Sequence, residues 1–166
     1  MILYTVVGNV GQERYLDLAE SGDITGKNVY VNITNRCPCS CVFCLRQTKQ
    51  MADNNTLWLK GNEPSVETVL NLLSNYDLSV IHELVFCGFG EPFERMDDMY
   101  QIIDAMKPFY SDLKIRVNTI GLANLIYGRE ITPGLNGRID TVSISLNAPS
   151  DEGFFALTSS KFGLKS

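Results

Sequence analysis

Short apolar runs alternate with helix-like segments along most of the chain. The β-branched run at residues 29–34 lacks strict alternation of apolar and polar side chains, which predicts a strand covered on both faces. Further strands are expected at residues 84–87, 115–119 and 141–146, where short apolar runs are flanked by turn-forming or polar residues. The pattern therefore predicts a sheet with four core strands.

Helical periodicity occupies the intervals between these strands. Apolar residues recur every three or four positions within residues 66–73 and again within 96–106, and a brief helix is expected at 123–127. Strand and helix alternate four times with short connections, which favours parallel strands joined by right-handed crossovers. We expect an α/β fold, specifically a partial, incomplete βα barrel of the TIM type.

The first 28 residues are expected to extend this core. Two apolar-rich runs, 2–7 and 13–18, flank Gly8-Asn9-Val10-Gly11, which predicts a β-hairpin at an edge of the sheet. Residues 29–149 then form the βα core, and residues 150–166 are expected as a short tail. A chain of 166 residues fits a single domain, because a domain of this size buries about two-thirds of the surface that its unfolded chain exposes.

Composition and charge argue against several classes of protein. No apolar run approaches the roughly 18 residues of a membrane span, and the segment after Met1 lacks the length and basic flank of a secretory signal. We therefore expect a cytoplasmic protein with no membrane partner. The net charge is −5 and the 14 lysines and arginines are scattered, so nucleic acid is not a favoured partner.

Four of the five cysteines lie within eight residues, from Cys37 to Cys44. In a reducing compartment, clustered cysteines indicate metal or redox chemistry more than a disulfide framework. Cys37, Cys41 and Cys44 have C-x3-C-x2-C spacing on a loop after the first core strand. A four-iron cluster normally takes one thiolate per iron, so three cysteines leave one iron open to another ligand.

A second feature, Gly88-Phe89-Gly90-Glu91-Pro92, follows the next core strand. Active sites of βα barrels form at the carboxyl ends of the strands, so this turn and the cysteine loop are expected on one rim. Together with Phe43, just before the last cysteine, these motifs resemble those of the radical S-adenosylmethionine superfamily. The chain looks most like the small members associated with TatD-family nucleases, through residues 30–37, 43–46, 87–92 and 145–149.

The resemblance implies a [4Fe–4S] cluster held by the thiolates of Cys37, Cys41 and Cys44. It implies that S-adenosylmethionine binds the open iron and that a reducing electron donor drives its cleavage to a 5′-deoxyadenosyl radical, which abstracts hydrogen from an unknown substrate. No protein side chain is assigned as catalytic. The candidate cofactor-binding residues are Phe43, Gly88, Phe89, Gly90, Glu91, Asn118, Ser143 and Ser145.

These cofactor-binding candidates have different physical grounds. Gly88 and Gly90 lack side chains where a ligand would approach the backbone, and Glu91 offers an acceptor for a ligand ammonium group. Phe43 matches the aromatic position that the superfamily places against adenine. Asn118, Ser143 and Ser145 carry polar groups on or after the last two core strands, and these groups alternate onto one face, toward ribose or carboxylate.

A structural zinc site is the alternative for the cysteine loop, with Cys39, Cys87 or His82 as the fourth ligand. Zinc sites usually pair two ligand-bearing turns, and the chain has no second C-x2-C. In this alternative the protein is a non-catalytic, zinc-stabilised or degenerate barrel that binds a partner. Outside that role, Cys87 is expected to pack as a small hydrophobic residue.

The end of the chain departs from the resemblance. It lies about twenty residues after the fourth core strand, whereas related barrels continue for further βα units. We expect either a short or truncated protein, or a partner that completes the open edge of the sheet. Self-association or binding of a TatD-family nuclease would supply such a partner.

Overall fold

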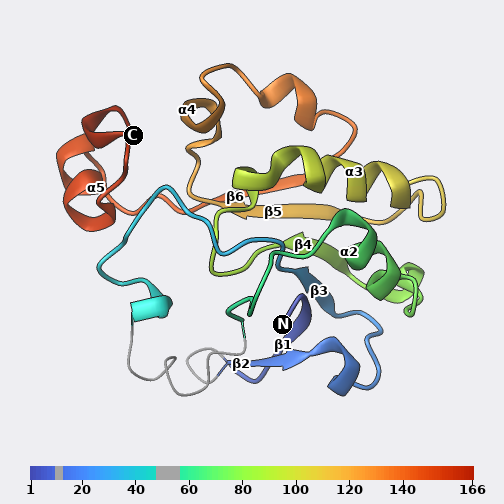
Figure 1. Cartoon of the computed structure of the whole chain (residues 1–166). Coiled ribbons are helices and arrows are strands. Elements are labelled where there is room, and N and C mark those ends of the chain that lie inside the picture. The colour runs from blue at the N-terminus through green and yellow to red at the C-terminus, as the bar shows by residue number, and fades with distance from the viewer. Residues whose placement is uncertain (10–12, 48–56) are drawn as a thin grey trace.

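The computed structural model describes residues 1–9, 13–47 and 57–166. Its centre is a six-stranded sheet in the order β2-β1-β3-β4-β5-β6 (Figure 1). The strands are β1 Leu3–Val7, β2 Arg14–Asp17, β3 Asn28–Val31, β4 Glu83–Phe86, β5 Ile115–Thr119 and β6 Thr141–Ile144. The α-helices are α2 Val66–Leu73, α3 Met96–Met106, α4 Ala123–Tyr127 and α5 Asp151–Thr158.

The sheet is mixed and mostly parallel. β3, β4, β5 and β6 run parallel to one another, whereas β1 is antiparallel to both β2 and β3. The expected α/β class and the N-terminal hairpin are therefore confirmed, although residues 10 and 11 of the predicted turn lie outside the described residues. The described strands form no closed barrel, because β2 and β6 stand at the two ends of the strand order.

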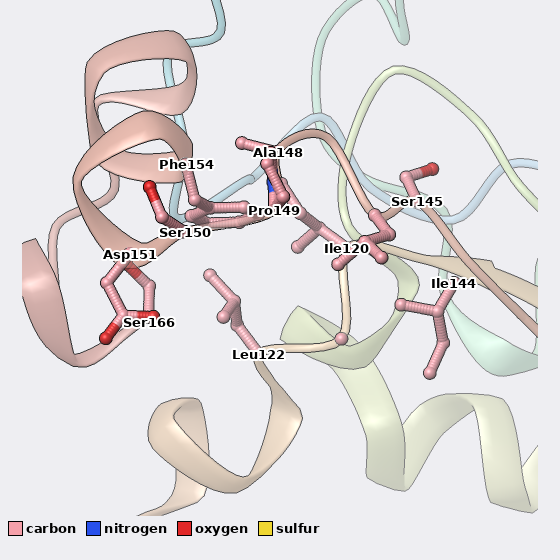
Figure 2. A pocket seen from close by; sticks show the side chains of 12 residues that line it. Ile120, Leu122, Ile144, Ser145, Ala148, Pro149, Ser150, Asp151, Phe154 and Ser166 are labelled. Atoms are coloured by element: carbon pink, nitrogen blue, oxygen red, sulfur yellow. The ribbon is translucent and has the colours of Figure 1, made fainter.

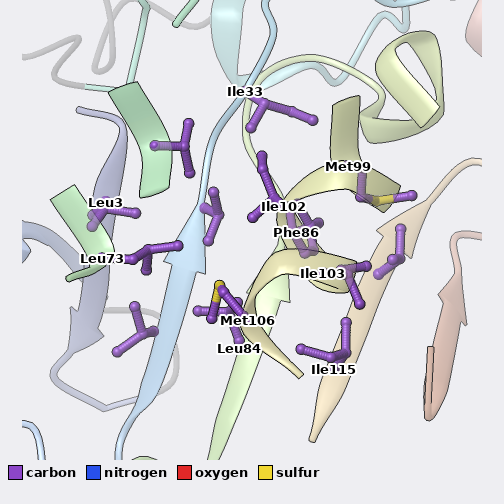
Figure 3. Close-up of a cluster of buried hydrophobic side chains, with 14 of the residues drawn as sticks. Leu3, Ile33, Leu73, Leu84, Phe86, Met99, Ile102, Ile103, Met106 and Ile115 are labelled. Atoms are coloured by element: carbon purple, nitrogen blue, oxygen red, sulfur yellow. The ribbon is translucent and has the colours of Figure 1, made fainter. Parts of the chain in front are cut away.

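Helices α2 and α3 cover one face of the sheet (Figure 1). In Figure 3, Leu84 and Phe86 of β4 lie with Ile102, Ile103 and Met106 of α3 in one apolar cluster. These α3 positions follow the three-to-four-residue spacing that brings side chains onto one helix face, so the amphipathic pattern explains the packing. Within the described ranges, no helix is long and apolar enough to cross a membrane.

The first core strand is shorter than predicted. β3 ends at Val31, three residues before the expected end at position 34. Beyond it, the side-chain amide of Asn32 donates to the Leu57 carbonyl at 2.6 Å. The Arg36 carbonyl accepts from the Glu91 backbone N–H at 2.7 Å. The chain after β3 therefore packs against the turn after β4, which positions the cysteine loop beside that turn.

Residues 150–166, which the sequence analysis assigned to a short tail, contain regular secondary structure. They form α5 and a short 3₁₀ helix at Gly163–Lys165, and α5 lies beside the segment that carries the cysteines (Figure 1). Ser150 caps α5, because its hydroxyl accepts from the Gly153 N–H at 3.2 Å, and two acidic residues follow in the first turn. This arrangement of a serine cap and acidic first turn is a helix-start signal that the sequence already contained.

The strand β6 is an exposed edge. It pairs with β5 in the described sheet, and its Val142 and Ile144 side chains are 38% and 60% exposed. Leu146 follows the strand and is also exposed. The predicted strand extended to residue 146, but β6 ends at Ile144, where the chain turns toward α5.

Candidate functional site

One pocket of about 360 Å³ lies where the segments after β3, β4, β5 and β6 meet. We call it the cysteine pocket. Its lining residues are Cys37, Cys41, Phe43, Cys44, Leu45, Cys87, Gly88, Phe89, Gly90, Glu91, Asn118, Thr119, Ile120, Ser145 and Asn147. Parallel strands bring their carboxyl ends to one edge of the sheet, which explains why segments so distant in sequence converge here.

The cysteine loop is held from behind by the C-terminal segment. The backbone N–H groups of Ser40 and Val42 donate to the carbonyls of Thr158 and Leu157 at 2.7 and 3.0 Å. The Lys161 N–H donates to the Pro38 carbonyl at 2.9 Å. These three bonds give the loop a defined backbone path, although it contains little regular secondary structure.

The same segment supplies apolar packing. Cys39 and Cys41 form a buried cluster with Leu122 and with Phe154 of α5. Cys37 and Cys44 are partly buried at the margin of this cluster. All the loop cysteines are free thiols, so no disulfide competes for the three that line the pocket.

The thiols of the loop differ in acidity. A hydrogen bond from Cys39 lowers the pKa of Cys37 to about 7, against the opposing effect of burial. The same hydrogen bond raises the pKa of Cys39, and burial raises the pKa of Cys41. Cys37 therefore has a partly ionised thiol near neutral pH in the metal-free protein, which suits a residue that binds metal as a thiolate.

The glycines of the turn are required by contact with the protein itself. A Cβ added to Gly90 would stand 2.3 Å from the Thr34 carbonyl oxygen and 2.6 Å from that of Arg36. A Cβ on Gly88 would stand 2.1 Å from the side-chain oxygen of Asn32. Both glycines line the cysteine pocket. Their missing side chains leave room for the segment after β3. This steric reason differs from the close approach of a ligand, which was the reason expected from the sequence.

Glu91 is almost completely buried, at 3% exposure, and its carboxylate is occupied by the protein. One oxygen accepts from the Phe93 N–H at 3.1 Å and from the Thr119 hydroxyl at 2.8 Å, and the other accepts from the Ile120 N–H at 2.8 Å. Burial raises the pKa of Glu91, while these hydrogen bonds act in the opposite direction. The side chain thus joins the turn to the end of β5.

The polar candidates on the last strands are placed unequally. Asn118 and Ser145 line the pocket, and the Asn118 side-chain oxygen is buried without a hydrogen-bond partner among the described residues. Ser143 is aligned with Asn118 across the strand pair but lies on exposed β6 and does not line the pocket. Phe43 lies at the rim, with 49% of its surface exposed.

Cys87 is a pocket residue for which the sequence analysis gave two roles, a packing residue or the fourth ligand of a zinc site. It lines the cysteine pocket, burial raises the pKa of its thiol, and its carbonyl accepts from the Tyr4 hydroxyl at 3.3 Å. Its position directly before the glycine turn was the available signal. Ile120 and Thr119, which follow or end β5, were also missed, because their role depends on contacts with Glu91.

A second pocket of about 320 Å³ adjoins the cysteine pocket and shares Ile120 and Ser145 with it. Figure 2 shows its walls, which include Leu122 after β5, Pro149 after β6 and Phe154 of α5. Asp151 is the charged side chain on this wall. We call it the neighbouring pocket.

The candidates for a fourth zinc ligand are placed differently, because Cys87 lines the cysteine pocket and Cys39 lies in the loop, whereas His82 is remote from both. His82 immediately precedes β4, so it lies at the opposite end of that strand from the glycine turn and the cysteine loop. In the described ranges, no three His, Cys, Asp or Glu side chains are arranged to hold one metal ion. A tetrahedral zinc site requires its ligands to converge on one atom, whereas a four-iron cluster takes its thiolates on separate irons.

No protein-family model, curated protein or solved structure matches the chain.

Proposed function

We propose that the chain is a radical S-adenosylmethionine enzyme whose cysteine pocket binds a [4Fe–4S] cluster and S-adenosylmethionine. The observation that carries this proposal is one pocket shared by the three loop thiols, the glycine turn and polar groups from the following strands. In this proposal the open, mostly parallel sheet is part of a βα barrel. The motif spacing is a feature of the sequence, and the pocket adds the convergence of both motifs with polar groups of β5 and of the segment after β6.

Cys37, Cys41 and Cys44 would each bind one iron as thiolates, and the fourth iron would be open to S-adenosylmethionine. When bound, the reduced cluster and S-adenosylmethionine supply the radical chemistry, so the protein needs no radical-forming side chain of its own. The protein positions and shields these groups. The unpartnered oxygen of Asn118 and the hydroxyl of Ser145 offer hydrogen-bonding groups at the pocket wall.

Glu91 has a positioning role in this proposal. Its carboxylate accepts three hydrogen bonds from the chain, so its side chain orders the pocket wall between the glycine turn and Ile120. The backbone carbonyls of the turn would then be the acceptors for the ammonium group of S-adenosylmethionine. A free carboxylate is not required for that contact.

In this proposal the neighbouring pocket binds part of the substrate, and its lining indicates the charge of the group that it accepts. Its described lining includes Asp151 but no lysine or arginine, so it favours a neutral or cationic group over an anionic one. Because this pocket shares Ile120 and Ser145 with the cysteine pocket, a group bound there lies next to the proposed cofactor site.

The experiment is anaerobic reconstitution with iron and sulfide, followed by measurement of bound iron, sulfide and zinc. We expect about four irons per chain in the wild type and loss of the cluster in Cys41→Ala. Cys87→Ala is the matched control, because it removes a thiol from the same pocket outside the motif. Stoichiometric zinc with no iron would favour the zinc-stabilised partner-binding module instead.

A further inference from the structure

Arg46 makes three contacts that the proposed function has not used. It lies in the 3₁₀ helix Leu45–Gln47, two residues after Cys44, and is partly buried. Its Nε donates to Cys44 Sγ at 3.2 Å. Its two terminal nitrogens donate to the carbonyls of Asn35 and Cys39 at 3.3 and 3.1 Å. One guanidinium therefore joins the beginning, middle and end of the cysteine loop.

Arg36, which lies just before the cysteine loop, has different contacts from Arg46. Arg36 pairs with Glu63 at 3.3 Å and has a largely exposed side chain. None of the ion pairs between described residues includes Arg46. Its positive charge is therefore directed at a thiol sulfur and two carbonyls.

We propose that Arg46 is a positioning residue for the iron–sulfur cluster, holding the Cys44 sulfur by a charge-assisted N–H···S bond and the loop backbone by its other two nitrogens. The inference rests on the proposed function, because it places the Arg46 guanidinium on the sulfur of a proposed cluster ligand. Hydrogen bonds to the sulfurs and nearby charge set the reduction potential of a cluster. Reduction adds negative charge, so the guanidinium stabilises the reduced form and raises the potential.

Lysine can replace the charge of Arg46 but not its geometry. The guanidinium is planar and presents its donors in a fixed fork, whereas a lysine ammonium is a point charge on a flexible stem. Arg46→Lys should therefore keep part of the effect on the potential and lose much of the effect on loop order. Arg46→Met removes both while retaining an apolar stem.

The test compares wild type, Arg46→Met, Arg46→Lys and the matched control Arg36→Met after anaerobic reconstitution. The measurements are the midpoint potential of the cluster, from an EPR-monitored titration, and the rate of iron loss to a chelator. For Arg46→Met we expect reduction to be about tenfold less favourable, which corresponds to about 59 mV for one electron. Iron loss should be about tenfold faster. Arg36→Met should match the wild type in both measurements.

The outcomes separate this inference from the proposed function. Wild-type protein that assembles no cluster would overturn both. A normal wild-type cluster with an unchanged potential in Arg46→Met and Arg46→Lys would overturn the inference alone, as would an equal shift in Arg36→Met. If Arg46→Met fails to fold, Arg46→Lys decides the matter, because its potential should still lie below that of the wild type.

Discussion

At the scale of single residues, the acidity of Cys37 depends on a thiol two positions away. Cys39 hydrogen-bonds to Cys37 and lowers its pKa to about 7, below the usual value for a cysteine. Cys39 itself is buried against α5 and does not line the cysteine pocket. Cys39, the loop cysteine outside the C-x3-C-x2-C motif, therefore increases the acidity of a proposed iron ligand without being an iron ligand itself.

This hydrogen bond predicts the pH dependence of alkylation in the iron-free, reduced protein. Reaction of Cys37 with iodoacetamide, followed by peptide mass spectrometry, should have a midpoint near pH 7, because the thiolate is the reactive form. In Cys39→Ala the midpoint should move upward. A wild-type midpoint at the value of an ordinary thiol would contradict the assignment.

The lowered pKa of Cys37 also predicts how the unfolding free energy changes with pH. The pKa of Cys37 is lower in the folded protein than in the unfolded chain, so ionisation favours the folded state. This contribution is fully present above the ordinary thiol pKa and is lost as the pH falls through about 7. The difference in unfolding free energy between wild type and Cys37→Ser, measured by urea titration, should follow that window.

Gly90 provides a stability test at the glycine turn. In Gly90→Ala the new Cβ meets backbone oxygens of Thr34 and Arg36, which cannot rotate away as a side chain can. We expect the unfolding free energy to fall by about 1–3 kcal/mol, the usual range for overpacking. Gly134→Ala is the control, because its closest neighbour is the Tyr100 side chain at 3.2 Å, and urea unfolding should show a change below about 0.5 kcal/mol. Equal losses would refute the proposed steric cause.

Sequence analysis identified the pocket residues whose signal is local. Cys37, Cys41 and Cys44 share a short spacing, and the glycine turn follows a strand, so both features could be placed from the chain alone. The partners of Glu91 could not be predicted, because Thr119 and Ile120 are nearly thirty residues away and meet it only in the folded sheet. Ser143 followed the expected alternation, yet exposed β6 leaves it outside the pocket.

At the scale of elements, α5 and the cysteine loop form one unit. Backbone hydrogen bonds join Ser40 and Val42 to the end of the helix, and Phe154 packs against Cys39 and Cys41. The acidic first turn and serine cap predict the helix, but its docking depends on contacts more than 100 residues apart in sequence. The docking could not be predicted from the sequence, because tertiary contacts leave no local pattern.

Two adjacent phenylalanines test this unit. Phe154 is 8% exposed and Phe155 is 41% exposed, so they offer the same change at a buried and a partly exposed position of α5. Phe154→Ala should lower the unfolding free energy by about 3–5 kcal/mol. Phe155→Ala should cost markedly less. Chemical unfolding of the iron-free proteins measures both, and similar losses would contradict the docking of α5 through Phe154.

At the scale of the whole molecule, Arg95 connects three segments around the parallel sheet. One terminal nitrogen donates to the carbonyls of Ile33 and Pro64, at 2.7 Å each, and Nε bonds to Asp98 at 2.7 Å. These partners lie after β3, before α2 and in α3. The side chain is mostly buried, so the two carbonyls depend on Arg95 for their hydrogen-bond donor.

Removing that connection should weaken the fold as a whole. Arg95→Met leaves two carbonyls without their donor, and we expect a loss of about 2–4 kcal/mol in unfolding free energy. Arg129→Met is the control, because Arg129 is exposed and its guanidinium carbon lies 5.8 Å from the centre of the Tyr127 ring. Its urea midpoint should stay close to that of the wild type, and an equal shift would contradict a specific role for Arg95.

The alternation of strands and helices predicted the parallel part of the sheet and the hairpin at its edge. Periodicity identifies which faces are buried, as in α3 against β4, and this is sufficient for the α/β class. It does not specify how far a sheet curves or closes, since that depends on the packing between elements. The described strands accordingly form an open sheet with β6 exposed.

The most direct test of the central claim is the formation of 5′-deoxyadenosine from S-adenosylmethionine. Anaerobically reconstituted protein is reduced with dithionite, and the nucleoside is quantified by liquid chromatography for wild type and Cys41→Ala. We expect 5′-deoxyadenosine in the wild type and none above background in the variant. An intact cluster that yields no 5′-deoxyadenosine, or equal amounts from both proteins, would contradict this claim.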